Sequence, residues 1–114
     1  MEVSIIDSGY ESYAFEKDLF LKNNILLRIF PTYGGNISEK QNFAKNADGI
    51  LVRHTKIDEA FLLRMKKLKA VVRYGVGYDN IDVEACTRHR IKVANVQGYA
   101  SHSVSDHALA LMFI

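Results

Sequence analysis

Short apolar runs recur along the chain about every 22 residues, and stretches of mixed polarity separate them. The runs begin near Val3, Ile25, Ala47, Ala70 and Ile91. Brief runs of this kind, rich in β-branched residues, are typical of buried strands in a parallel sheet. Because the intervening stretches differ in sequence, we interpret the rhythm as successive strand–helix units and not as a solenoid repeat.

The pattern predicts five strands, of which the first ends at Asp7 and the second is stopped by Pro31. Strands that alternate with helical segments indicate an α/β fold with a parallel sheet and right-handed crossovers. The predicted strands cover residues 3–6, 25–30, 49–52, 70–72 and 91–94.

The first two connecting segments carry helix signals of different kinds. Phe15, Leu19 and Lys22 have the spacing of one face of an amphipathic helix. After the second strand, Ser38 to Gln41 has capping-box spacing, which predicts a helix from Ser38 to about Lys45.

The third connecting segment predicts a helix that Asp58 or Thr55 caps. Phe61, Met65 and Leu68 lie three or four residues apart, so they share one face of that segment. We expect this face to pack on the sheet.

Two glycines follow the fourth strand, and they organise the rest of the chain. Gly75 and Gly77 allow the backbone to turn tightly and to approach a ligand. Asp82 then caps a helix over residues 83–88. This order places free backbone N–H groups and a helix N-terminus at one edge of the sheet, which suits an anion. A tight turn without any ligand is the alternative.

The glycine loop differs from a dinucleotide fingerprint. The motif G-x-G-x-x-G needs a third glycine at position 80, where the chain has Asn80. No clear acidic residue ends a following strand about 20 residues later, where a ribose would be bound. We therefore interpret the loop as a site for a small anion rather than for a pyrophosphate.

Cationic side chains lie at the predicted carboxyl ends of two strands. His54 follows the third strand and Arg73 the fourth, and ligands of open α/β sheets bind at this edge. The Arg73 guanidinium can bind a carboxylate through two hydrogen bonds. A surface salt bridge for Arg73 and a hydrogen-bonded loop histidine for His54 remain alternatives, and Arg53 is expected to be exposed without a role. Tyr74 and Tyr78 either line a substrate pocket or pack within loops.

Composition narrows the function classes. With 114 residues the chain suits one domain, and 48% hydrophobic with 25% charged residues is ordinary for a globular protein. The net charge of +2, with scattered Lys and Arg, argues against a nucleic-acid surface. The single cysteine, Cys86, fits a reducing, cytoplasmic location. No apolar run approaches the length of a membrane span.

Three segments resemble the D-isomer-specific 2-hydroxyacid dehydrogenases, and the close match covers residues 49–114. The segments are R-Y-G-V-G-Y-D-N-I-D at 73–82, I-K-V-A-N-V-Q-G-Y at 91–99 and S-V-S-D-H-A-L-A-L at 103–111. The corepressor C-terminal binding proteins share the pattern. Gln97 is a departure, because the family usually has proline there.

The resemblance implies a fold and a substrate site. The fold is a flavodoxin-like or Rossmann-like three-layer sandwich with a five-stranded parallel sheet in the order 2-1-3-4-5. Family members bind the substrate carboxylate through backbone N–H groups of the loop that matches Gly75, Val76 and Gly77. The corepressor branch has an arginine that matches Arg73 near the substrate. Residues matching Val76 and Val104 lie near the cofactor.

The resemblance also implies a division of the chain. Residues 1–100 match the substrate-binding domain, and residues 101–114 match the start of the interdomain helix, cut before the NAD-binding domain. The family's activating arginine, acid–base histidine and NAD fingerprint come later in its sequence. We therefore expect NAD or NADP in a longer protein. We expect no cofactor binding, no catalytic residues and no activity in this chain alone.

The expected function is substrate binding in an NAD(P)-dependent oxidoreductase that interconverts a D-2-hydroxy acid and a 2-oxo acid. A corepressor-like, NAD-sensing scaffold is the alternative. A receiver-type signalling module is disfavoured because Asp7 has no acidic neighbour and Arg53 ends the third strand. The last helix is apolar all round from Ala108 onward, so we expect a homodimer or other self-association through residues 104–114.

Overall fold

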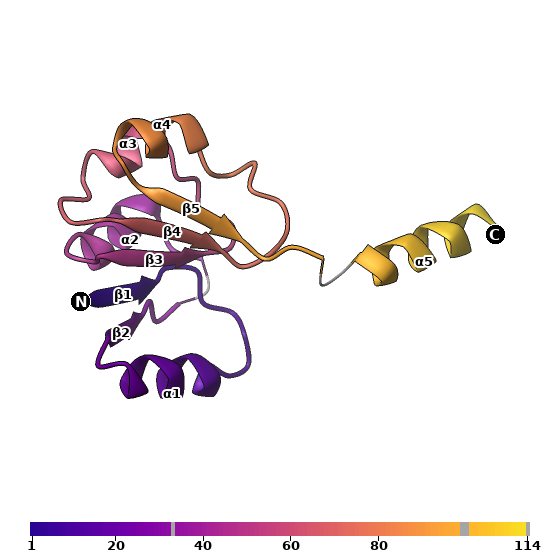
Figure 1. The fold of residues 1–114 in the computed structure, drawn as a ribbon, viewed down its shortest axis with the longest axis horizontal. Coiled ribbons are helices and arrows are strands. Elements are labelled where there is room, and N and C mark those ends of the chain that lie inside the picture. Colours follow the sequence, from indigo (N-terminus) through magenta and orange to yellow (C-terminus); the bar gives the residue numbers. More distant parts are fainter. Residues whose placement is uncertain (33, 99–100, 114) are drawn as a thin grey trace.

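A computed structural model describes residues 1–32, 34–98 and 101–113 of the chain, without the side chains of 101–103. Five parallel strands form one sheet in the order β2-β1-β3-β4-β5, which confirms the predicted order. The strands run toward the side from which α5 extends (Figure 1). Their bounds are β1 Glu2–Ile5, β2 Leu26–Ile29, β3 Gly49–Val52, β4 Ala70–Arg73 and β5 Lys92–Asn95.

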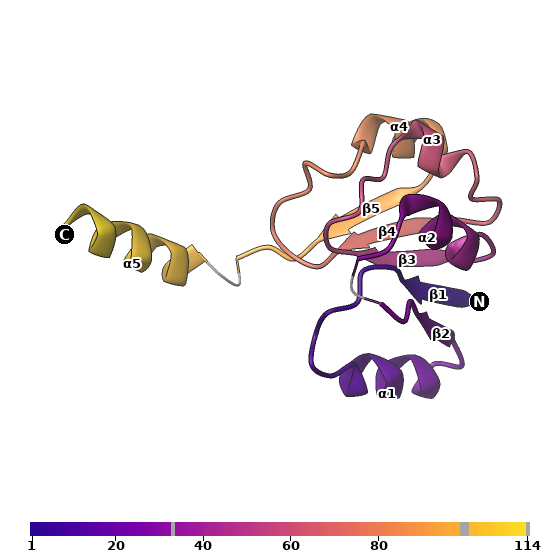
Figure 2. The same cartoon turned by 180° about the vertical axis from the view of Figure 1, so that it is seen from behind.

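Helices connect successive strands, as predicted. In Figures 1 and 2, α1 lies beside β1 and β2, whereas α3 and α4 lie together near β4 and β5. β2 is added on one side of β1, and β3, β4 and β5 are added in turn on the other side. With right-handed crossovers, this order puts α1 on the opposite face of the sheet from α2, α3 and α4. The helices are α1 Ala14–Lys22, α2 Ile37–Ala44, α3 Glu59–Leu62, α4 Val83–Arg88 and α5 Ser101–Met112.

Side-chain caps begin three of the helices. Asp58 accepts a hydrogen bond from the backbone N–H of Phe61, and Asp82 accepts one from Ala85, each at 2.9 Å. Both caps were predicted, although Thr55 was an alternative to Asp58. The predicted start of α2 at Ser38 was wrong, because Asn36 in extended backbone accepts from the N–H of Glu39 at 2.8 Å. A cap needs its acceptor three residues before the donor, and Asn36 meets that spacing.

The main core lies on one face of the sheet. β3 contributes Ile50 and Val52, and β4 contributes Val71. The predicted apolar face of the third connecting segment is buried there, although α3 itself ends before Met65. Phe61, Leu62, Met65, Leu68, Ala85 and Cys86 complete most of this core from the helical side.

The helix predicted from Phe15, Leu19 and Lys22 is present as α1, but these three residues are not buried. Phe15 is 76% exposed and Leu19 is 44% exposed, and α1 has no fully buried residue. Glu16 and Phe20 are the half-buried residues of this helix, and Tyr13 just before it is half-buried as well. The helix therefore packs through a face that carries Glu16, which the apolar pattern does not reveal.

The last helix extends away from the α/β body (Figures 1 and 2). Every residue of α5 whose side chain is described, from 104 onward, is exposed. Among the described residues, no helix is long and apolar enough to cross a membrane.

Candidate functional site

The carboxyl edge of the sheet is built around Asp7, which follows β1 and is almost fully buried. Its Oδ2 accepts the backbone N–H groups of Arg53, His54 and Thr55 at 2.7–2.8 Å. Its Oδ1 accepts from the Lys40 ammonium and the Thr55 hydroxyl, both at 2.5 Å. One carboxylate thus fixes the whole turn that follows β3.

These contacts also control the charge of Asp7. Burial favours the neutral acid and opposes ionisation. The hydrogen bonds from Lys40, from Thr55 and from the backbone outweigh burial and hold the Asp7 pKa well below its ordinary value of 3.8. Lys40 lies on α2 and is itself buried, so the pair ties α2 to the turn after β3. In the sequence, Asp7 stands as an isolated acid without an acidic neighbour, and these partners are far from it.

The turn after β3 in turn holds Arg73, the residue predicted to bind a carboxylate. The Arg73 Nε donates to the carbonyl oxygen of Arg53 at 3.1 Å, and Nη1 donates to that of Tyr74 at 3.0 Å. Arg73 is half-buried and has no ion pair among the described residues, so the surface salt bridge is not what holds it. Neither bond uses Nη2, which therefore has donors left for a ligand.

The position of this guanidinium leaves no room for a side chain at residue 75, so a glycine is needed there. Its φ is +145°, a conformation that side chains rarely adopt. A Cβ there would lie 1.7 Å from Nη1 of Arg73. The glycine therefore allows the arginine to lie directly against the loop backbone.

The loop from Gly75 to Gly77 directs its carbonyl groups toward β5. The carbonyl of Gly75 accepts from the N–H of Val96 at 2.9 Å, and that of Val76 accepts from the Asn95 amide at 2.7 Å. Within the part of the chain that the structure describes, the N–H groups of Val76 and Gly77 donate to no protein acceptor. Two backbone donors are thus open beside Arg73, at the predicted edge of the sheet.

Asn80 stands where a dinucleotide fingerprint would have its third glycine, and its side chain explains the departure. Its amide donates to the carbonyl of Thr55 at 2.9 Å. The backbone carbonyl of Asn80 accepts from the N–H of Ile57 at 2.8 Å. Asn80 therefore joins the glycine loop to the turn after β3.

The other predicted site residues, His54 and Val104, belong to segments outside the glycine loop. His54 is exposed and lines a cavity of about 280 Å³ together with Asp7, Gly34 and Lys40. Val104 is 64% exposed on α5. The described residues contain no cluster of acidic, histidine and cysteine side chains that would hold a metal ion.

Arg53 was expected to be exposed, and this prediction was wrong. Its guanidinium lies 4.3 Å from the centre of the Tyr10 ring, so the side chain is half-buried. Tyr10 also contacts Tyr74 edge-on, with ring centres 5.3 Å apart. The Tyr74 hydroxyl donates to Glu16 at 2.9 Å, and burial together with this carboxylate raises the Tyr74 pKa. Sequence reasoning missed Tyr10, because only the fold brings it next to the glycine loop.

Comparison with known proteins identifies the family of this architecture. Residues 13–110 match the family model "D-isomer specific 2-hydroxyacid dehydrogenase, catalytic domain". A D-3-phosphoglycerate dehydrogenase of Mycobacterium tuberculosis is 46% identical over 67 residues, which are 58% of this chain and 13% of that protein. Glyoxylate/hydroxypyruvate reductase B of Serratia proteamaculans is 35% identical over 77 residues, 68% of this chain and 24% of that protein.

Solved structures agree with the sequence relatives. The NAD⁺-bound 3-phosphoglycerate dehydrogenase of Entamoeba histolytica superposes with a TM-score of 0.80 at 30% identity, over 98% of this chain and 38% of that one. An acyclic imino acid reductase in complex with NADPH and D-Arg superposes with a TM-score of 0.86 at 24% identity, over 99% of this chain and 36% of that one. At this level of identity the similarity supports the fold alone. The chain thus spans only a minor part of each relative. It belongs to the D-isomer-specific 2-hydroxyacid dehydrogenase family and matches that family's catalytic domain.

Proposed function

We propose that this chain binds the carboxylate of a small substrate in an NAD(P)-dependent dehydrogenase that interconverts a D-2-hydroxy acid and a 2-oxo acid. The substrate would be of the D-lactate, glyoxylate/glycerate or 3-phosphoglycerate type. The observation that supports this most is the pair of open N–H groups at Val76 and Gly77 beside the Arg73 guanidinium. Hydrogen bonds from a cation and from backbone donors to one carboxylate are stronger than those between neutral groups.

Each residue of the site has a distinct part in this proposal. Val76 and Gly77 donate backbone hydrogen bonds, and Arg73 supplies charge through its remaining N–H donors. Gly75 leaves room for the guanidinium, and Asp7 positions the turn that accepts from it. His54 is proposed to contact the substrate from the side of α2. These residues bind and orient the acid but move no proton.

The nicotinamide cofactor supplies the hydride acceptor or donor when it is bound. Val76 and Val104 are proposed to lie near it. Because Asn80 occupies the place of the third fingerprint glycine, we propose that this chain alone binds neither NAD nor NADP and has no dehydrogenase activity. The residues that hold the cofactor and transfer the proton would belong to a longer protein.

Steady-state kinetics of a longer protein that contains this chain would test the carboxylate site. Arg73→Ala should lower kcat/KM for 2-oxo acids by about ten- to a hundredfold, as expected for a lost hydrogen bond of a charged group. Gly77→Val should do comparable harm, because a Cβ at Gly77 would lie 3.3 Å from Oδ1 of Asp79 and a branched side chain would cover the backbone donor. Wild-type kinetics in both variants would show that the loop is only a turn.

We also propose that the chain self-associates through the exposed apolar residues of α5. Leu109, Leu111 and Met112 are 52%, 58% and 80% exposed, and Phe113 is 87% exposed. An apolar surface of this kind is usually buried by association, and a second copy of the chain offers the same surface for a symmetric contact. Ile114, which was part of the predicted contact, lies outside the described residues. Buried, unpaired Cys86 supports a reducing, cytoplasmic location.

A further inference from the structure

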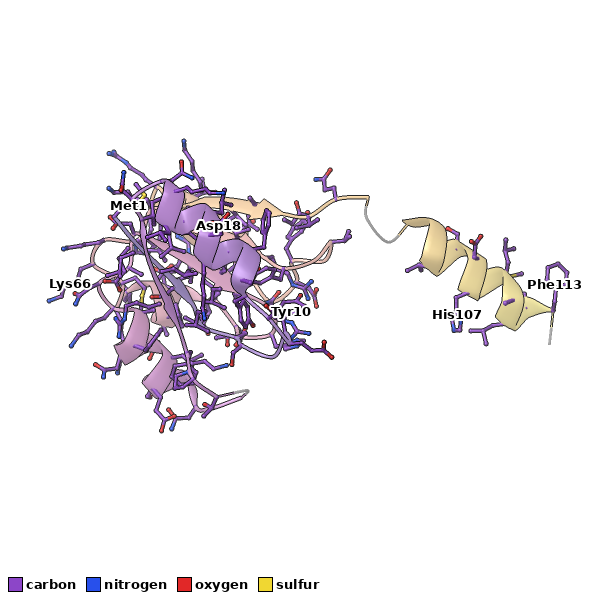
Figure 3. The ribbon with its side chains drawn as sticks, turned by 90° about the horizontal axis from the view of Figure 1, so that it is seen from below. Met1, Tyr10, Asp18, Lys66, His107 and Phe113 are labelled. Atoms are coloured by element: carbon purple, nitrogen blue, oxygen red, sulfur yellow. The ribbon has the colours of Figure 1, made fainter. Side chains whose placement is uncertain are left out.

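An apolar pocket opens directly beside the glycine loop. Tyr10, Tyr74, Gly75 and Val96 line it, and we call these four residues the tyrosine pocket. Figure 3 shows Tyr10 at the end of the α/β body that faces α5, opposite Met1 and Lys66. Gly75 belongs both to this pocket and to the loop that carries the open N–H groups. A molecule bound by its carboxylate at the loop therefore has this pocket within reach of its other end.

The walls of the tyrosine pocket are held in place by contacts with one another and with Tyr13 and Glu16. The Tyr74 hydroxyl donates to Glu16, and the Gly75 carbonyl accepts from Val96. The Tyr10 ring packs edge-on against Tyr13 at 5.9 Å and against Tyr74 at 5.3 Å. Several polar groups of the lining are thus already bonded within the protein. Ring faces and the Val96 side chain remain for a ligand, and they favour an apolar group.

The pocket is large enough for an aromatic ring. Its volume is about 200 Å³, and an apolar protein cavity of about 150 Å³ holds benzene. Arg53 stacks on Tyr10 and fixes that ring, while Arg73 is bonded to backbone carbonyls. Neither guanidinium is among the residues that line the pocket. A phenyl ring in the pocket would meet two tyrosine rings, whereas the neighbouring guanidiniums already contact the Tyr10 ring and backbone carbonyls.

We propose that the tyrosine pocket binds the side chain of the substrate and selects a 2-hydroxy or 2-oxo acid with an aromatic side chain over one with a methyl or phosphate-bearing side chain. This inference rests on the proposed carboxylate site at Val76 and Gly77. It adds the substrate class, which the fold does not determine.

A titration of the ¹⁵N-labelled chain with three stable acids would test the inference. The probes are D-lactate, D-3-phenyllactate and D-3-phosphoglycerate, and the amide signals of Val76 and Gly77 report binding. We expect all three to shift these signals, with phenyllactate binding at least about tenfold more tightly than lactate. Burial of roughly half a phenyl ring in an apolar site supplies a factor of this size.

Variants of Tyr10 separate the pocket from the carboxylate site. Tyr10 is 44% exposed, so its replacement should not unfold the chain. Tyr10→Ala should remove most of the preference for phenyllactate, so that phenyllactate and lactate bind with similar affinity. Tyr10→Phe keeps the ring and should keep the preference. Phe15→Ala removes an exposed aromatic ring from α1 and serves as the matched control, with wild-type binding of all three acids.

The outcomes distinguish the two proposals. If lactate shifts neither Val76 nor Gly77, the carboxylate site itself is wrong, and the pocket inference falls with it. If lactate binds there but phenyllactate binds no better, the pocket inference alone is overturned. It is also overturned if phosphoglycerate binds most tightly, or if Tyr10→Ala leaves the preference intact.

Discussion

Replacing Asp7 by asparagine should destabilise the whole carboxyl edge of the sheet. The Asp7 carboxylate accepts five hydrogen bonds from Lys40 and the turn at 53–55. An asparagine has one carbonyl oxygen, and its amide group would face donors instead of accepting from them. It would also leave the buried Lys40 ammonium without a counter-charge. Breaking a buried pair by removing one partner costs about 3–5 kcal/mol.

That loss is a large part of the total stability, which is about 5–15 kcal/mol for a domain of this kind. Urea denaturation followed by circular dichroism would give the free energy of unfolding at pH 7. The exposed ion pair of Asp18 and Lys22 on α1, in which Nζ of Lys22 lies 2.7 Å from Oδ2 of Asp18, provides a matched control. Asp18 is labelled in Figure 3. Asp18→Asn should cost less than about 1 kcal/mol. The double change Asp7→Asn with Lys40→Met should recover part of the loss, because no buried charge remains.

The pH dependence gives an independent check on the same pair. The folded-state pKa of Asp7 is lowered, so its contribution to stability is present above the ordinary pKa of 3.8 and is lost as the pH falls from there toward the folded value. The difference in stability between wild type and Asp7→Asn should therefore shrink as the pH drops below about 4. A cost below 1 kcal/mol at pH 7, or a difference that does not change with pH, would refute the reasoning.

Three further predictions concern the core, the cofactor and α5. Ser4→Ala should leave the free energy of unfolding unchanged or raise it by up to about 1 kcal/mol, because the buried Ser4 hydroxyl has no hydrogen-bond partner in the described structure. Thermal melting would measure this, and a loss above about 1 kcal/mol would contradict it. Calorimetric titration of the chain with NAD or NADP should show no binding at millimolar concentration, and micromolar affinity would overturn the interpretation of Asn80. Sedimentation at micromolar concentration should show self-association that Leu109→Ser with Phe113→Ser abolishes. A monomeric wild type with α5 ordered would count against that contact.

Features that depend on neighbouring residues could be predicted from the sequence. Asp58 and Asp82 cap their helices because each precedes its donor by three residues. The strand order followed from the family resemblance, and the glycine loop lies at the predicted edge. These properties depend on local spacing or on a motif that the sequence displays.

Features that depend on distant contacts could not be predicted. Asp7 acts on residues 46–48 positions away, and nothing near it in the sequence shows those partners. Tyr10 contributes to the candidate site only because the turn after β1 meets the loop after β4. The apolar pattern of α1 does not show that Glu16 packs inward, because its partner Tyr74 is 58 residues away.

We propose above that backbone donors at Val76 and Gly77, together with Arg73, bind a carboxylate. The most direct measurement compares amide shifts of the ¹⁵N-labelled chain during titration with pyruvate and with methyl pyruvate, which has the same keto group but no charge. We expect saturable shifts at Val76 and Gly77 with pyruvate and no such shifts with the ester. Arg73→Ala should weaken the affinity for pyruvate about tenfold or more. Equal shifts with acid and ester, or none at these two amides, would contradict it.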